Sequence, residues 1–216
     1  MNFEAAREQM IEQQVRAWDV FNEDVLNAMR TVRRENFLTK EFHNVAFADS
    51  SIPLPQGQTM LSPSIHGRIL QALAVTANDI VLEIGAGSGY LSACLGQLGS
   101  RVRSLEIIPE LAELARRNVL NAAANNVAVE LADGTKLDEP GAYDVIAVTG
   151  SLPVYDERFQ RALKPGGRLF VAVGQAPAME AWLVTRMGER EWQRQSLFET
   201  VIDPLIHAVQ PPAFVF

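Results

Sequence analysis

The chain has 216 residues, of which 48% are hydrophobic and 21% charged, a composition typical of a globular protein. This composition excludes a disordered, collagen-like or coiled-coil chain, and no apolar run reaches the roughly 18 residues that span a bilayer. The 26 acidic and 19 basic residues give a net charge of -7, which argues against broad binding to nucleic-acid phosphates.

The amino-terminal third predicts a helical cap. Residues 4–17 are polar and helix-prone with a partial apolar stripe, and Asn22 is placed to cap a second helix. The stretch 47–63 contains three prolines, which forbid a regular helix or a central strand. Ser62 followed by Pro63 is typical of a helix start, with Ser62 as the N-cap residue.

The middle of the chain alternates between short apolar runs and helical patterns, which predicts a parallel sheet covered on both faces. After Ala178 we expect a helix and then two weaker strand-like runs. The fold class is therefore α/β: a Rossmann-like, doubly wound, mostly parallel sheet with helices on both faces and an N-terminal helical cap. The expected strands are 80–84, 102–105, 127–131, 143–148, 169–173, 192–200 and 205–209; the expected helices are 90–98, 109–124 and 157–163.

A glycine-rich loop follows the first strand of this pattern. Its spacing is G-x-G-x-G, whereas the dinucleotide fingerprint requires G-x-G-x-x-G. Glycines there allow a tight turn and a close approach of a ligand, although such a loop can also be only a turn. An acidic residue at the end of the strand could hold a cationic part of the ligand. The loop residues predicted to contact a ligand, with that acid first, are Glu83, Gly85, Ala86, Gly87, Ser88 and Gly89.

Acidic residues also end the next two expected strands. Glu106, followed by Ile107, lies about 20 residues after the glycine loop, where a carboxylate can accept hydrogen bonds from both ribose hydroxyls. Asp133 and Gly134 are placed to meet an adenine edge. Either acid taken alone could be a solvated strand end or an ordinary turn residue. Together with the glycine loop they predict a nucleoside pocket, and S-adenosylmethionine fits it better than NAD because no phosphate cradle is present.

These motifs resemble the class I S-adenosylmethionine-dependent methyltransferases, and the segment Leu163–Leu169 is similar to their turn into the fifth strand. Segments Arg7–Arg16 and Arg34–Phe37 resemble the opening of the protein-L-isoaspartate O-methyltransferase family. The block Gly57-Gln58-Thr59 ahead of the glycine loop is fairly specific to that family. The resemblance implies methyl transfer from S-adenosylmethionine to the carboxylate of an isoaspartyl residue in a damaged protein or peptide, with S-adenosylhomocysteine as product.

The resemblance also implies roles for particular residues. Thr59, Ser62 and His66 would act at the catalytic site, although Ser62 is more simply explained as a helix cap. The family usually has a serine where this chain has Leu61, so a hydroxyl is lost on the acceptor side. Two alternatives stay open for this reason: a methyltransferase of the same fold with another acceptor, and a donor-binding protein without isoaspartyl activity.

We expect one domain, 1–216, divided by function. Residues 1–75 would form the cap and the acceptor-side loop, 76–175 the donor-binding core, and 176–216 a C-terminal helix and strands. The amino terminus does not resemble a signal peptide, the single Cys94 excludes an internal disulfide, and no zinc-like histidine spacing occurs. We therefore expect a cytoplasmic monomer or weak homo-oligomer that uses no metal and binds neither nucleic acid nor membrane.

Overall fold

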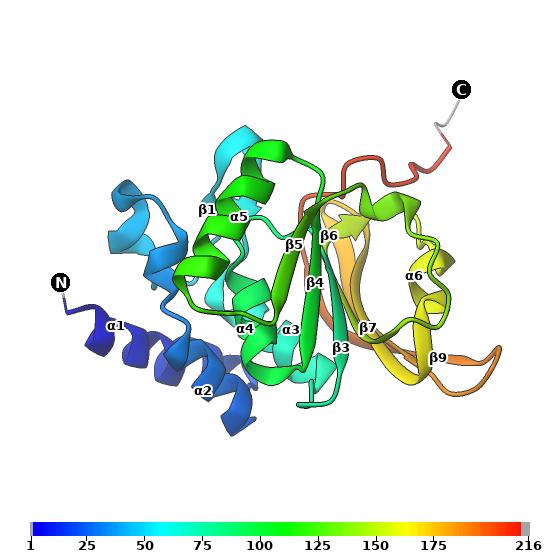
Figure 1. The fold of residues 1–216 in the computed structure, drawn as a ribbon, viewed down its shortest axis with the longest axis horizontal. Helices are drawn as coiled ribbons and strands as arrows, with labels where there is room; N and C mark the ends of the chain where they lie inside the picture. The colour runs from blue at the N-terminus through cyan, green and yellow to red at the C-terminus, as the bar shows by residue number, and fades with distance from the viewer. Residues whose placement is uncertain (1, 213–216) are drawn as a thin grey trace.

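The computed structural model describes residues 2–212, which fold around a seven-stranded sheet with the strand order β5-β4-β3-β6-β7-β8-β9 (Figure 1). Neighbouring strands from β5 to β7 are parallel, and β8 and β9 add to this sheet in antiparallel pairs. The expected doubly wound, mostly parallel architecture is confirmed. The strands are β3 (Ile80–Ile84), β4 (Arg101–Glu106), β5 (Val127–Leu131), β6 (Tyr143–Leu152), β7 (Leu163–Gln175), β8 (Ala178–Arg186) and β9 (Trp192–Thr200).

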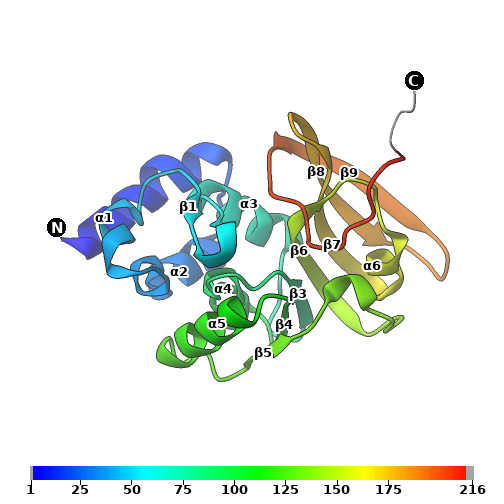
Figure 2. The same ribbon diagram turned by 90° about the horizontal axis from the view of Figure 1, so that it is seen from above.

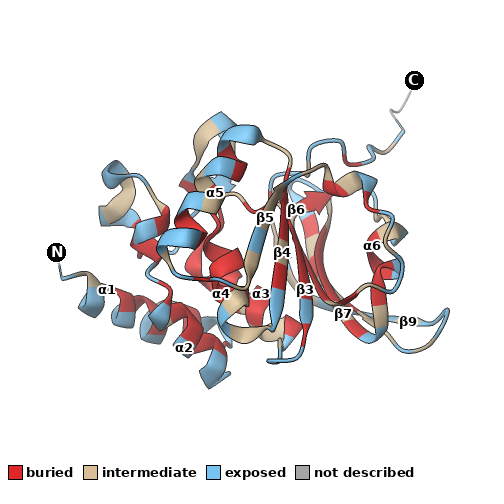
Figure 3. Ribbon diagram, viewed as in Figure 1, coloured by how far each residue is buried: buried red, intermediate tan, exposed pale blue. Residues whose placement is uncertain are grey.

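Helices cover both faces of the sheet, but unequally (Figure 2). Val81 of β3 packs into a core that also contains residues of the N-terminal cap, α3 and α4. The next residue, Leu82, points to the other face of the sheet and packs into a second core with Phe159 of α6. This alternation follows from the two-residue period of a strand. Figure 3 shows the buried residues along the strands and on the helix faces that contact them. The helices are α3 (Pro63–Leu73), α4 (Tyr90–Leu98), α5 (Pro109–Asn121) and α6 (Glu157–Arg161).

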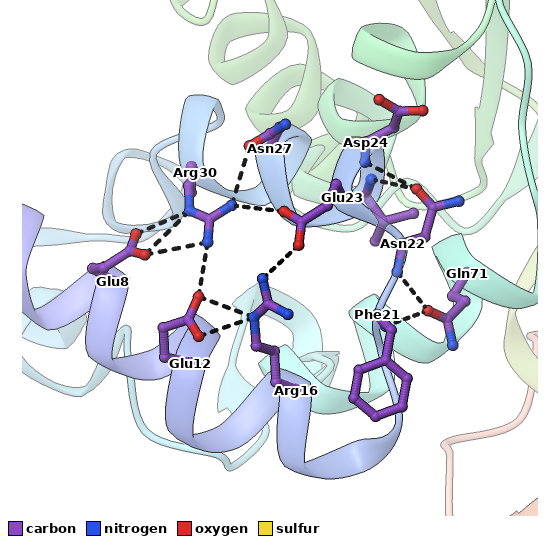
Figure 4. A network of polar contacts seen from close by, with 11 residues as sticks. Glu8, Glu12, Arg16, Phe21, Asn22, Glu23, Asp24, Asn27, Arg30 and Gln71 are labelled. Carbon is purple, nitrogen blue, oxygen red and sulfur yellow. Dashed lines mark hydrogen bonds and ion pairs between the residues drawn. The ribbon is translucent and has the colours of Figure 1, made fainter.

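The N-terminal cap is built from α1 (Phe3–Met10), which continues as a π-helical turn and a 3-10 turn up to Trp18, and α2 (Glu23–Thr31). An exposed network of ion pairs joins the two helices (Figure 4): Arg30 pairs with Glu8 and Glu12. Such exposed pairs each contribute less than about 1 kcal/mol. The buried apolar residues of the cap therefore contribute more to its attachment; they include Met10, Ile11, Val15, Leu26 and Met29.

Two helix starts are found where the sequence indicates them. The Asn22 side chain accepts hydrogen bonds from the backbone N–H groups of Asp24 and Val25, and Ser62 accepts one from Ile65 at the start of α3. The proline-rich stretch before α3 forms two strands of two residues each, β1 (Ile52–Pro53) and β2 (Thr59–Met60), with a 3-10 turn (Pro55–Gly57) between them, in agreement with its composition. Within residues 2–212 no helix combines the length and apolar character that a membrane crossing requires.

Two expectations for the C-terminal region are wrong. Residues after Ala178 form strand β8 rather than a helix. Their composition favours a helix, but their backbone pairing with β7 on one side and β9 on the other stabilises the strand more. The run 205–209 is not a strand, although a single bridge joins Pro204 to Ser151 of β6. Pro204 lacks an amide hydrogen and His207 has a positive φ of 67°, and both interrupt a regular ladder.

Candidate active site

The glycine loop joins β3 to α4 and has the conformation that its composition predicts. Gly85 and Gly89 have φ values of 95° and 83°, which side chains rarely adopt. A Cβ atom on Gly85 would collide with Oγ1 of Thr149, and one on Gly89 would lie 3.1 Å from the backbone of Ala115. Gly85 therefore allows β6 to approach the loop. Gly89 is the N-cap residue of α4 and does not line either of the two cavities described below.

A cavity opens at the carboxyl ends of β3, β4, β5 and β6. This is the position where open α/β sheets bind their ligands. The sequence-predicted residues that line it are Thr59, Gly85, Gly87, Glu106, Ile107, Asp133 and Gly134. Gln58 also lines it, within the loop 56–63 that the family resemblance implies to cover the methyl donor. Lining residues that were not predicted include Thr135, Thr149, Gly150 and the segment 202–206.

Glu106 lies at the end of β4 and is only 5% exposed. Its Oε2 accepts a hydrogen bond from the backbone N–H of Gly87 at 2.9 Å, and its Oε1 accepts one from Ile108 at 3.0 Å. These two bonds fix the carboxylate against the glycine loop. Each carboxylate oxygen keeps a further lone pair, so Glu106 can still accept hydrogen bonds from a pair of ligand hydroxyls.

Asp133 lies one strand further along, after β5. Its Oδ1 accepts hydrogen bonds from the hydroxyl and the backbone N–H of Thr135, at 2.6 and 3.0 Å, and its Oδ2 contacts Nδ1 of His207 at 2.9 Å. Burial alone would raise the pKa of Asp133, but these hydrogen bonds lower it to about 2. Asp133 is therefore an ionised acceptor at the edge of the cavity.

A smaller cavity adjoins the first one at the glycine loop, and Glu83 and His66 are among the residues that line it. Glu83 is completely buried and accepts hydrogen bonds from the hydroxyls of Ser92 and Ser104. Both hydroxyls donate to Oε2 of Glu83. Among the described residues, Oε1 has no hydrogen-bond partner. Burial raises the pKa of Glu83 to about 7. A buried carboxylate with a free oxygen is suited to a cationic ligand group.

Strand β2 and the loop that joins it to α3 form another part of the wall of both cavities. Thr59 and Leu61 line the two cavities, and the Thr59 hydroxyl donates a hydrogen bond to Oδ2 of Asp203 at 3.1 Å. Ser62 lines neither cavity: it caps α3 and shares a hydrogen bond with the hydroxyl of Ser64. The structure thus gives Ser62 the capping role and keeps it away from the cavity surface.

Arg34 holds this loop in place through a buried guanidinium. It was not predicted as a site residue from the sequence. Its buried guanidinium donates to the carbonyls of Leu61 and Ala46, at 2.6 and 2.9 Å, and to Nδ1 of His66 at 3.0 Å. Since arginine only donates, Nδ1 of His66 must be the acceptor. Burial, together with the neighbouring arginine charge, holds the pKa of His66 well below its ordinary value. His66 is therefore a neutral imidazole at the smaller cavity.

The fold and these cavities define a nucleoside-binding α/β protein of the class I methyltransferase type. Carboxylates follow β4 and β5 at the places that suit a ribose and an adenine, and the free oxygen of Glu83 suits a cationic end. A family model described as protein-L-isoaspartate(D-aspartate) O-methyltransferase (PCMT) matches residues 5–209. The chain belongs to this family.

Individual relatives agree with the family model. A protein-L-isoaspartate O-methyltransferase of Koribacter versatilis is 37% identical over 205 residues, covering 94% of this chain and 92% of the relative. One of Rhodopseudomonas palustris is 38% identical over 201 residues, covering 92% of each chain. These matches include the C-terminal region, so the likeness extends beyond the donor-binding motifs.

Solved structures support the same fold. A protein from Plasmodium falciparum assigned to these methyltransferases, in complex with S-adenosyl-L-homocysteine, has a TM-score of 0.83 over 95% of this chain and 99% of its own, at 18% identity. A protein-L-isoaspartate O-methyltransferase has a TM-score of 0.82 at 25% identity, over 94% of this chain and 67% of its own. The cap, sheet and C-terminal strands thus share one arrangement with these proteins.

Proposed function

We propose that this protein transfers the methyl group of S-adenosylmethionine to the carboxylate of L-isoaspartyl residues in damaged proteins or peptides, leaving S-adenosylhomocysteine. The proposal is supported by the placement of Glu106 and Asp133 at one cavity and of Glu83 at an adjoining cavity, in a chain of this family. The family assignment favours this reaction over another acceptor or a donor-binding protein without turnover.

The donor supplies a methyl group on a positively charged sulfonium. In our proposal Glu106 binds the ribose hydroxyls, Asp133 and Gly134 bind the adenine edge, and Glu83 balances the cationic end of the donor. Gly85 and Gly87 allow the donor to approach the loop backbone, with Ala86, Ser88 and Ile107 completing the surroundings. Gly89 acts indirectly, because it sets the start of α4.

The acceptor needs no general base, because a carboxylate with a pKa near 3.9 is already ionised at neutral pH. Within residues 2–212, neither lysine nor arginine lines the two cavities. The positive charge that attracts the acceptor carboxylate is therefore the sulfonium of the donor. Both charges are neutralised when the methyl group passes from the sulfur to the carboxylate. Positioning and exclusion of water supply the remaining catalysis. Thr59 and His66 are placed to orient the reactants.

Leu61 replaces the serine that the family usually has, and its side chain lines both cavities. The Leu61 carbonyl accepts a hydrogen bond from Arg34 at 2.6 Å, so the loop backbone stays fixed whichever side chain it carries. We propose that Leu61 is an apolar part of the cavity wall that lacks the acceptor-side hydroxyl, whereas Thr59 is the nearby hydroxyl on the cavity surface.

The test compares two peptides that differ only in one residue, isoaspartate or aspartate, incubated with labelled S-adenosylmethionine. We expect methylation of the isoaspartyl peptide alone, and alkaline release of the label as methanol marks an ester. Equal labelling of both peptides contradicts the proposal.

We also propose a division of the chain in which residues 1–75 serve the acceptor, 76–175 bind the donor and 176–216 complete the site. The enzyme would act in the cytoplasm as a monomer or weak homo-oligomer, without nucleic acid as partner. The net charge of -7 supports the last point, since phosphates would be repelled.

A further inference from the structure

The segment 201–208, which we call the C-terminal strap, crosses the carboxyl end of β6 after leaving β9. Figure 2 shows it as the red segment that passes the ends of β6 and β7. Ser151 of β6 binds the strap: its N–H donates to the carbonyl of Asp203 at 2.9 Å, its hydroxyl donates to that of Ile202 at 2.8 Å, and its carbonyl accepts from Leu205 at 3.0 Å. Since Ser151 is fully buried, this attachment belongs to the core.

The strap forms one wall of the larger cavity. Five consecutive residues, 202–206, line that cavity, and Leu205 lies close to Gly85 of the glycine loop. Leu205 lies so close to Gly150 that a Cβ atom there would be 2.6 Å from the Leu205 side chain. Residues next to β2 and a segment from the other end of the chain therefore both contribute to the cavity wall.

Two side chains of the strap bind residues assigned above to the donor site. Asp203 accepts the hydrogen bond from the Thr59 hydroxyl, which joins the strap to the β2 loop across the cavity. His207 contacts the carboxylate of Asp133 through Nδ1 at 2.9 Å. Because the ionised Asp133 only accepts, Nδ1 of His207 carries the hydrogen in this contact. The strap is therefore attached at Ser151 by backbone and core contacts, and at Thr59 and Asp133 by exposed side-chain contacts.

We propose that Asp203 and His207 are positioning residues: they hold the strap over the bound donor and so slow its release. The identity of the donor rests on the function proposed above. Asp203 fixes Thr59 at the cavity, and His207 orients the carboxylate of Asp133 and covers its outer side. Breaking either contact leaves the attachment at Ser151 intact, but lets the outer parts of the strap move away from the ligand.

The experiment measures how fast labelled S-adenosylhomocysteine dissociates from the full chain after mixing with excess unlabelled ligand. Asp203→Ala and Thr59→Val each remove the Thr59 contact, and we expect dissociation about tenfold faster in both, the equivalent of one hydrogen bond. The double variant should be no faster than either single one, because both remove the same bond. Asp203→Asn keeps a side-chain oxygen that can accept the hydrogen bond, and Thr59→Ser keeps the hydroxyl that donates it. Both variants should release the ligand at about the wild-type rate.

His207→Ala should also accelerate release, whereas His207→Asn can place an amide N–H near the position of Nδ1 and should restore the wild-type rate. Asp24→Ala, on the exposed start of α2, is the matched control and should change nothing. Association rates and the melting temperature without ligand should stay close to wild type, which separates positioning from a general loss of structure.

The outcomes distinguish the two proposals. If the wild-type chain binds no S-adenosylhomocysteine, the proposed function is overturned, and the inference with it. If the wild type binds but Asp203→Ala and His207→Ala release the ligand at the wild-type rate, only the role of the strap is overturned. Independent, multiplying effects of Asp203→Ala and Thr59→Val would also contradict it.

Discussion

Arg34 donates a hydrogen bond to Nδ1 of His66, with 3.0 Å between the two nitrogens, and the same guanidinium binds the Leu61 carbonyl. One buried cation thereby sets both the protonation of His66 and the path of the loop that borders the donor and acceptor sites. The cation is stabilised by three acceptors and by the Tyr90 ring, whose centroid is 5.1 Å away.

We expect Arg34→Lys to lower the free energy of unfolding by about 3 kcal/mol, because one ammonium group cannot reach all three acceptors in the same geometry. Urea denaturation of wild type and variant at pH 7 measures the difference. Arg30→Lys, in the exposed network of the cap, is the control and should cost less than about 1 kcal/mol. Equal losses in the two variants would contradict the role given to Arg34.

The pKa of about 7 for Glu83 predicts how stability depends on pH. Between the ordinary value near 4.5 and about 7, the folded protein keeps a proton that the unfolded chain has lost, so stability falls as pH rises through this window. The full effect is about 3 kcal/mol. Comparing Glu83→Gln with wild type at pH 5 and pH 8 isolates it, since other groups cancel. A difference that does not change with pH would place the pKa of Glu83 outside this range.

The same carboxyl group should make donor binding depend on pH. Above pH 7 Glu83 is ionised and attracts a cationic donor, whereas near pH 6 most of it is protonated. We expect calorimetric affinity for S-adenosylmethionine to rise between pH 6 and pH 8 and to stay nearly flat in Glu83→Gln. A proton released on binding at pH 6.5, detected in buffers of different ionisation enthalpy, provides a second readout.

Glu106→Ala should weaken donor binding by about 1–3 kcal/mol, because the ribose hydroxyls and two loop amides lose their acceptor. Titration calorimetry with S-adenosylhomocysteine measures the change. The exposed Glu113 on α5 provides a matched control, since Glu113→Ala removes the same side chain outside the cavity. Unchanged affinity in Glu106→Ala would exclude Glu106 as the ribose ligand.

Leu61→Ser would restore the hydroxyl that the family usually has at this place. We expect kcat/KM for an isoaspartyl peptide to increase several-fold, on the order of one additional hydrogen bond to the acceptor. The loss of a side chain that is only 8% exposed should cost about 2 kcal/mol of stability. Leu61→Ala creates the same space without a hydroxyl and is the control; an equal gain in both variants would show that space, not hydrogen bonding, limits the reaction.

The donor side could be predicted from the sequence because its signals are local. The glycine loop follows directly on β3, Glu106 is the last residue of β4, and Asp133 comes two residues after β5, so chain order alone places them at one edge of a parallel sheet. The start of α3 could be predicted for the same reason, because the Ser62 hydroxyl and the Ile65 backbone N–H that donates to it are only three residues apart. Short-range rules suffice for such features.

The remaining features depend on contacts between distant parts of the chain. Residues after Ala178 have a helix-prone composition, and only their pairing with β7 and β9 makes them a strand. The contact between Thr59 and Asp203 joins positions 144 residues apart, and Arg34 reaches His66 across 32. No spacing rule connects such pairs, so the sequence indicated a donor site but neither its covering segment nor the support beneath its loop.

The attachment of segment 201–208 to Ser151 has a consequence for synthesis in the cell. A growing polypeptide that has emerged up to β7 already contains the glycine loop, Glu106 and Asp133, yet one wall of their pocket has still to be made. A chain interrupted between β7 and residue 202 would therefore contain Glu83, Glu106 and Asp133 but lack one side of the pocket, and we expect it to bind the nucleoside more weakly.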